Sequence, residues 1–152
     1  MTKEVLLSLK GLQFDGMGQE DLTTILPAEY YWKNGKHYVI YEEVAEGYTG
    51  ATRNVIKFQD HTLDVIKKGE VNVHLLFEEN RKNLSNYATP FGEIMVGINT
   101  THMEMTENEN QIRLDVSYGL EVNYQHLADC RISLNICPRH ESEEIFEKHE
   151  MS

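Results

Sequence analysis

The sequence lacks the features that mark membrane-spanning and nucleic-acid-binding proteins. No apolar run in its 152 residues approaches the ~20 residues that a membrane-spanning helix needs. Basic residues are scarce, with 14 lysines and arginines against 25 aspartates and glutamates. The resulting net charge of −11 repels phosphate backbones and anionic lipids. We therefore expect neither a nucleic acid nor a membrane as a partner.

The chain is also poor in cysteine, with only Cys130 and Cys137. Both fall on one predicted strand, where their spacing separates the Cα atoms by roughly 23 Å, whereas a disulfide tolerates at most about 7 Å. We expect two thiols and a cytoplasmic location, because disulfides are rare in the cytoplasm. Met1 to Glu4 carries a single lysine and no small-residue cleavage site follows, so it predicts the start of a strand rather than a signal peptide.

Recognisable catalytic and metal-binding motifs are absent from the sequence. Gly16-Met17-Gly18 begins like a dinucleotide-binding loop, but Asp21 stands where the third glycine would be. There is no Gly-x-Ser-x-Gly elbow and no Cys-x-x-Cys pair, and the seven histidines show no metal-ligand spacing. The sequence thus predicts no catalytic residue, metal ion or other cofactor, and it favours a protein that is not an enzyme.

What the sequence does contain is alternation of apolar and polar residues over most of its length. In the clearest segment the apolar positions are Ile112, Leu114, Val116, Tyr118, Leu120 and Val122. A period of two over this length is typical of a long β-strand with one buried face and one face in water. Similar segments predict further strands at residues 4–12, 22–33, 37–44, 51–58, 62–67, 71–77, 91–105 and 127–137.

The connections between these segments carry their own signals. Asn34-Gly35 predicts a type I′ hairpin, and Pro27 predicts an edge position, a bulge or a bend within its strand. The polar segment 78–86 predicts a longer connection rather than a strand.

Met95, Met103 and Met105 share one face of the long strand at 91–105, where they could form an adaptable ligand surface. The favoured alternative is a bulge near Asn99 to Thr101, which would let this strand bend around a barrel and would change its facing so that these methionines fill the core.

About nine short strands with no helix between them predict an antiparallel meander. A meander of this length tends to close, because closure removes its exposed edges. We therefore expect an all-β barrel of about 8–10 strands, with a two-sheet sandwich as the alternative. One domain should cover residues 1–138, and an acidic tail at 139–152 should be frayed or form a short docked helix.

Several short markers make the chain similar to a known family. They are Tyr41-Glu42, the turn from Gly47 to Thr52, Ile66-Lys67-Lys68-Gly69, Leu76-Phe77-Glu78 and Tyr87-Ala88-Thr89-Pro90-Phe91-Gly92. In their order and spacing the chain, up to about Cys137, resembles the YwiB-like family of small bacterial β-barrel proteins, a domain of unknown function. Lys67-Lys68-Gly69 departs mildly from the arginine–glycine pairing that the resemblance leads us to expect. The resemblance implies a calycin-like fold, as in lipocalins and fatty-acid-binding proteins, and it implies no activity or catalytic residue.

Four polar or aromatic residues fall on strand faces that are otherwise apolar. They are Tyr41, Arg53, His102 and Tyr118. If these faces line the barrel, the four side chains could orient a carboxylate or another polar head group, with aliphatic side chains around its tail. The alternative is that they hydrogen-bond to one another or lie in water at the barrel mouth.

Two functions therefore remain open. The first is a non-enzymatic barrel that holds a small, partly apolar ligand. The second is a filled barrel that acts as a protein-interaction or structural module, as a monomer or a homodimer. The aromatic cluster Tyr30-Tyr31-Trp32 motivates the second function.

Overall fold

The computed structural model describes residues 1–11, 23–44 and 50–139, and these form ten β-strands. The strands are β1 (Glu4–Lys10), β2 (Thr23–Lys33), β3 (Lys36–Glu43), β4 (Thr52–Gln59), β5 (Thr62–Gly69), β6 (Val73–Glu78), β7 (Arg81–Thr89), β8 (Gly92–Asn108), β9 (Gln111–Val122) and β10 (Gln125–Pro138). Among the described residues, no helix is long and apolar enough to cross a bilayer. The predicted acidic tail, the loop at 15–21 and most of the turn that starts at Gly47 lie outside these residues.

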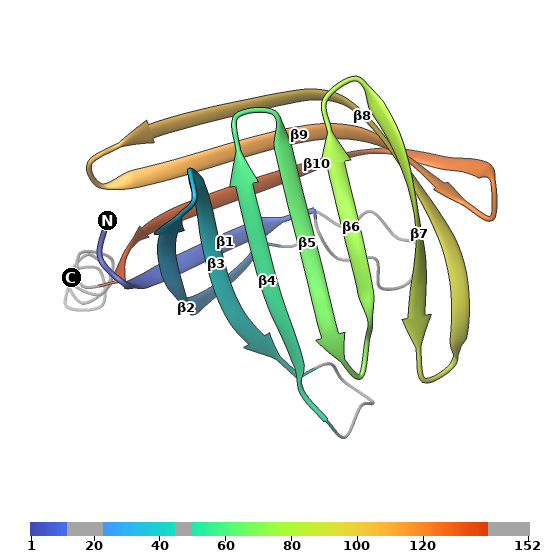
Figure 1. The fold of residues 1–152 in the computed structure, drawn as a ribbon, viewed down its shortest axis with the longest axis horizontal. Coiled ribbons are helices and arrows are strands. Elements are labelled where there is room, and N and C mark those ends of the chain that lie inside the picture. Colours follow the sequence, from blue (N-terminus) through green and yellow to red (C-terminus); the bar gives the residue numbers. More distant parts are fainter. Residues whose placement is uncertain (12–22, 45–49, 140–152) are drawn as a thin grey trace, which may run out of the picture.

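All ten strands belong to one antiparallel sheet that closes through the first and last strands. The strand order is β6-β5-β4-β3-β2-β1-β10-β9-β8-β7, and β1 pairs with β10 from Val5–Pro138 to Lys10–Ser133. In Figure 1 the long strands β8, β9 and β10 cross one side of the molecule, and the shorter β3 to β6 run across the other. The fold is a nearly closed all-β barrel, as predicted, and the two-sheet sandwich alternative is wrong because there is a single sheet.

The barrel wall has a seam between β6 and β7, the two ends of the strand order. Their turn joins them at one end, and an isolated bridge between Asn72 and Ala88 joins them at the other, with N–O distances of 2.8 and 2.9 Å. Between these points the Ser85 hydroxyl donates a hydrogen bond of 2.5 Å to the His74 carbonyl. A side chain therefore substitutes here for the regular backbone ladder that joins the other neighbouring strands.

Strand β7 corrects the prediction that residues 78–86 form a connection. Its alternation is inverted, because Leu84 is half exposed while Asn83 and Ser85 are more buried than their neighbours. Polar side chains suit the seam, where they can replace missing ladder bonds. An inverted pattern of this kind gives no hydrophobic period of two, which is the signal by which a strand is found in sequence.

Two local predictions are confirmed. Asn34 and Gly35 have φ values of 54° and 74°, and positive φ at both central residues is what a type I′ hairpin requires. The first half of β2 pairs with β1 and the second half with β3, so Pro27 pairs with Leu6 on one side and has no partner on β3 in the described ladder. Pro27 thus occupies the edge position among the alternatives predicted for it, where its missing N–H is tolerated.

A register shift in β8 between Thr100 and His102 confirms the predicted bulge. The extra residue exchanges the two faces of the strand, so Ile98 faces the interior before the shift and Met103 faces it afterwards. Met105 packs against the same core, whereas Met95, before the bulge, is only partly buried. The bulge therefore places Met103 in the core and Met105 against it, as predicted, whereas the same prediction for Met95 is not met.

The middle of the barrel is filled by side chains. A contiguous apolar cluster draws on every strand, with β7 contributing only the partly buried Tyr87. Val39 on β3, Val65 on β5 and Leu75 on β6 have no exposed surface at all. Side chains with no exposed surface have no water-sized space beside them, so the central interior has no cavity there. Any ligand in this barrel must therefore bind away from the middle.

We expect Gly69→Ala to destabilise the barrel more than Gly92→Ala. Both glycines have strongly positive φ, 142° and 134°, which costs about 1–3 kcal/mol for a residue with a side chain. At Gly69 an added Cβ would also lie 2.3 Å from the Ala51 carbonyl oxygen, whereas at Gly92 it meets nothing within 4 Å. Urea unfolding should show the lower midpoint for Gly69→Ala, and equal midpoints would contradict the close approach of Ala51.

Candidate functional site

Three polar side chains face the interior on neighbouring strands at one end of the barrel. Tyr41 on β3 lies opposite Asn54 on β4, and Asn54 lies opposite Lys67 on β5. All three are buried, and Lys67 is only 7% exposed. Buried lysines are rare and need a partner for the ammonium group. We call these three residues, together with Glu43, the Lys67 cluster. Of the groups inside the barrel, it differs most clearly from the apolar side chains around it.

The contacts within the Lys67 cluster converge on one carboxylate oxygen. Lys67 Nζ donates a hydrogen bond of 2.7 Å to Glu43 Oε1 and another of 2.7 Å to Asn54 Oδ1. Asn54 Nδ2 donates to the same Glu43 oxygen at 3.1 Å. The Glu43 side chain is 39% exposed, so the cluster opens to solvent on the side of Glu43.

Apolar and hydroxyl-bearing side chains surround the Lys67 cluster. Val73 lies opposite Lys67 on β6, and the Thr52 hydroxyl accepts a hydrogen bond of 3.3 Å from the Val71 N–H. Burial raises the pKa of the Tyr41 hydroxyl, and the nearby Glu43 carboxylate raises this pKa further. Tyr41 therefore keeps its proton and can serve as a hydrogen-bond donor.

Of the four residues predicted to line the barrel, Tyr41 and Tyr118 are interior and Arg53 and His102 are not. Arg53 is exposed because it is next to Asn54 on β4, where successive side chains alternate between faces. His102 is exposed because it follows the β8 bulge, and its Nδ1 lies 3.9 Å from Glu79 Oε2 on the outside. The predictions for Arg53 and His102 as barrel-lining residues are therefore wrong.

Sequence reasoning missed Asn54 and Lys67. A signal for Lys67 was present, because Leu63 and Val65 precede it with the spacing of one strand face. A lysine at the end of such a face is ordinarily read as the point where the strand leaves the core. Asn54 could have been found from Ile56 and Phe58, which share its face and are buried.

Tyr118 belongs to a second interior region, next to Thr100 and Cys130. These residues lie opposite one another on β8, β9 and β10, and the Tyr118 ring meets Phe77 edge-on with 5.0 Å between centroids. Burial raises the pKa of Tyr118, with a further contribution from Cys130. Thr100 Oγ1 and Asn83 Nδ2 are buried there without a hydrogen-bond partner.

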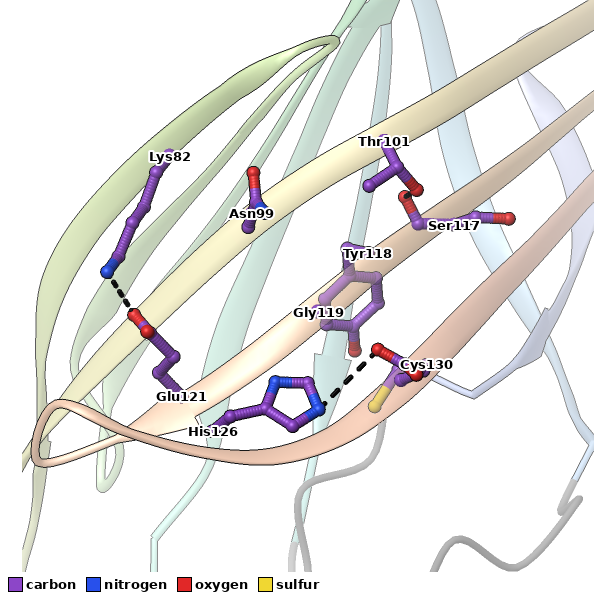
Figure 2. A pocket seen from close by; sticks show the side chains of 10 residues that line it. Lys82, Asn99, Thr101, Ser117, Tyr118, Gly119, Glu121, His126 and Cys130 are labelled. Carbon is purple, nitrogen blue, oxygen red and sulfur yellow. Dashed lines mark hydrogen bonds and ion pairs between the residues drawn. The ribbon is translucent and has the colours of Figure 1, made fainter.

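A pocket of about 270 Å³ lies over β7 to β10. Figure 2 shows Lys82 directed at Glu121, and His126 forms a second pair with Asp129. The Nζ–Oε2 distance of the first pair is 2.5 Å and the Nε2–Oδ1 distance of the second is 3.5 Å. The side chains of Lys82, His126 and Asp129 are 46%, 58% and 93% exposed, whereas Lys67 is buried, so the pocket is a weaker candidate than the Lys67 cluster.

Chemistry that needs a metal finds no support in the described part of the chain, where no group of three or more His, Cys, Asp or Glu is placed to hold one. Cys130 and Cys137 are not joined by a disulfide, as predicted.

His37 forms a third polar group, at the opposite end of β3 from Tyr41. Only 2% of it is exposed, its Nδ1 lies 2.7 Å from the Tyr30 hydroxyl, and its Nε2 lies 3.5 Å from Glu107 at the end of β8. Burial lowers the pKa of His37, against the opposing effects of Glu107 and Asp60. Its ring also stacks on Phe58, so His37 is a structural residue that has no access for a ligand.

Comparisons with known proteins agree with this architecture. A family model described as a domain of unknown function, DUF1934, matches residues 7–134. The uncharacterized beta-barrel protein YwiB of Bacillus subtilis (strain 168) is 24% identical over 131 residues, which cover 85% of this chain and 91% of that protein. The crystal structure of ywiB protein from Bacillus subtilis matches with a TM-score of 0.73 at 20% identity and covers 90% of this chain and 92% of that one. At this identity the likeness shows a shared fold.

We expect the stability that His37 contributes to fall as the pH is lowered from 7.5 to 5.5. Its pKa is lowered in the folded state, so the unfolded chain takes up a proton first, from about pH 6.5 downwards, and unfolding is favoured by at most about 1.4 kcal/mol per unit of pKa difference. The difference in unfolding free energy between wild type and His37→Gln should shrink at pH 5.5. His126→Gln, which removes an exposed histidine, is the control, and a difference that grows at low pH would contradict the assignment.

Replacing the orphaned hydroxyl of Thr100 should stabilise the barrel. Thr100→Val removes a buried Oγ1 that has no partner and keeps the shape of the side chain, so we expect a gain of about 1 kcal/mol in urea unfolding. The control is Thr101→Val, which removes a hydroxyl that donates a 3.2 Å bond to the Ser117 carbonyl on the outer face. A loss of stability in Thr100→Val would mean that the hydroxyl has a bound partner.

Proposed function

The chain belongs to the DUF1934 family of proteins of unknown function, and on that premise we propose that it is a non-enzymatic binding protein for a small, partly apolar ligand. The ligand would bind at the barrel end formed by Tyr41, Asn54 and Lys67. The observation that supports this proposal is Lys67 itself, a lysine that is 7% exposed in a largely apolar interior.

The energetics of a buried lysine support a role beyond stability. Removing an ammonium group from water costs several kcal/mol, and a well-packed apolar residue in its place is often neutral or stabilising. A barrel selected for stability alone would therefore do as well with a leucine or methionine at this position. Ligand sites, in contrast, combine apolar walls with a few placed polar groups, and the Lys67 cluster with Val71 and Val73 has that composition.

The filled middle of the barrel limits where such a ligand can go. Val39, Val65 and Leu75 leave no water-sized space beside them, so the proposed ligand occupies the end of the barrel rather than a central cavity. This placement differs from a hollow, calycin-like barrel in which the ligand lies in the middle. We retain the calycin-like relationship as part of the proposal, since an eight- to ten-stranded antiparallel barrel supports it.

The non-enzymatic part of the proposal is supported by the side chains of the cluster. The raised pKa of Tyr41 keeps its hydroxyl protonated. Lys67 Nζ, the amine of the cluster, donates its hydrogen bonds to Glu43 and Asn54 within an ion pair, which disfavours it as the nucleophile of covalent catalysis. The two thiols of the chain support a cytoplasmic location. We propose no metal or other cofactor.

A second candidate function is a protein-interaction module, as a monomer or a homodimer. Strand β2 exposes three large apolar side chains: Ile25 near its start, and Tyr31 and Trp32 near its end, with Trp32 60% exposed. Exposed apolar groups of this size mark interaction surfaces when they are contiguous. This candidate needs no ligand and is compatible with a filled barrel.

Native mass spectrometry of the protein as purified from cells tests the ligand proposal. We expect wild type to carry an excess mass that is lost on denaturation. Lys67→Met should lose this excess, because the ammonium group that holds the ligand is gone. The matched control is Lys68→Met, in which the neighbouring exposed lysine is replaced, and it should retain the excess.

Bare masses for all three proteins would contradict the ligand proposal. A dimer peak in the same spectra would then favour the interaction module, and its loss in Trp32→Ala would place the interface on β2.

A further inference from the structure

We propose that the ligand's head group is a single carboxylate, and that Glu43 occupies its place on Lys67 and Asn54 when no ligand is bound. This inference rests on the proposed function and names the chemical class of its ligand. The exchange is non-covalent, with one carboxylate leaving the cluster as another enters.

The two side chains that would bind the ligand's carboxylate, Asn54 and Lys67, are held in place by the sheet. Asn54 and Lys67 lie directly opposite each other in the β4–β5 ladder, and both side chains are buried. Asn54 Oδ1 accepts a 2.7 Å bond from Lys67 Nζ, which orients the amide so that its Nδ2 points at the same carboxylate oxygen as the ammonium group. Two donors from two strands thus converge on one point, and this arrangement would receive a carboxylate from any source.

The Glu43 side chain, in contrast, lies where it can move. Glu43 is the last residue of β3, its side chain is 39% exposed, and the following Val44 is largely exposed. Its carboxylate can therefore rotate into water and be solvated there, provided that another carboxylate takes its place on Lys67. The donors, in contrast, cannot leave, because Asn54 and Lys67 lie within paired strands.

Charge balance selects a monoanion over other head groups. Lys67 and Glu43 neutralise each other at 2.7 Å. A neutral head group that displaced Glu43 would leave the buried ammonium without a counter-charge, which is strongly unfavourable. A doubly charged phosphate would bring an excess negative charge into the cluster of a chain whose net charge is already −11. A carboxylate keeps the cluster neutral and reproduces the hydrogen-bond geometry that Glu43 shows.

The walls of the site indicate a short apolar tail. Tyr41, Val71 and Val73 are slightly exposed, whereas Val39 and Leu75, further into the barrel, have no exposed surface. The tail can therefore cover the rim residues and cannot pass into the filled middle. A short alkyl carboxylate meets both conditions.

Titration of the full-length protein with hexanoate, hexanol and hexyl phosphate, followed by amide NMR shifts, tests this inference. We expect hexanoate to bind wild type at the β3–β5 end, and hexanol to bind at least about tenfold more weakly, because it lacks the charge-assisted hydrogen bonds. Hexyl phosphate should also bind more weakly than hexanoate. Lys67→Met should abolish the difference between hexanoate and hexanol.

Glu43→Gln is the decisive variant, because it removes the competing carboxylate and keeps the size of the side chain. We expect it to bind hexanoate at least about tenfold more tightly than wild type, since no ion pair has to be broken first. Glu42→Gln, which removes an exposed carboxylate one residue earlier, should leave the affinity unchanged. If Glu43→Gln does not fold, Glu43→Asp withdraws the carboxylate from Lys67 by one methylene and should tighten binding in the same direction.

The outcomes separate this inference from the proposed function. Equal affinities for hexanoate and hexanol, or no tightening in the Glu43 variants, would overturn the carboxylate exchange, even if native mass spectra show a cellular ligand. Tighter hexanoate binding in Glu43→Gln together with bare native spectra would support the exchange chemistry and overturn the proposal that the protein carries a ligand in the cell.

Discussion

The pairing of β1 with β10 is the interaction on which the rest of the structure depends. It joins the beginning of the described sheet to its end, with Leu7 opposite Ile136, and so converts an open meander into a barrel (Figure 1). In a closed barrel one face of every strand is directed at the interior, so alternate residues on each strand pack into a shared core. It also fixes where the wall is weakest, because β6 and β7 become the two ends of the strand order.

A closed interior makes each polar group inside it consequential, since water cannot satisfy that group. The three interior polar regions meet this demand in different ways. His37 contacts Tyr30 and Glu107, and burial lowers its pKa, whereas the hydroxyl of Thr100 has no hydrogen-bond partner among the described residues. Lys67 alone keeps a full charge, balanced by a carboxylate that reaches it from the exposed end of β3. This difference is why the functional argument rests on the Lys67 cluster rather than on the pocket over β7 to β10.

The strands, the hairpin at Asn34-Gly35 and the β8 bulge could be predicted because each has a local signal in the sequence. β7 could not, because at the seam Asn83 and Ser85 take interior positions that are apolar elsewhere. The candidate site could be predicted at Tyr41, and strand parity places Lys67 and Asn54 on interior faces, but their contacts have no signal in the sequence. Arg53 shares its strand face with Ala51 and Val55, which are themselves exposed or partly exposed. His102 follows the β8 bulge, which exchanges the two faces of that strand. Lys67 and Asn54 depend on strand parity and on a partner, Glu43, that only the folded ladder brings within reach.

The position of the seam, between β6 and β7 rather than between the first and last strands, has a consequence for how the barrel folds. Every neighbouring pair of strands except β1–β10 is consecutive in sequence, so nearly all of the ladder can assemble from short loops. The β1–β10 pairing must instead close a loop of almost the whole chain, which is entropically the most costly contact to make. Val5 lies opposite Pro138, so a short linker could join the two strands. A circular permutant opened at the β6–β7 turn would then have a sheet order identical to its chain order. In such a permutant the slow, long-range step of the natural chain becomes one more local hairpin.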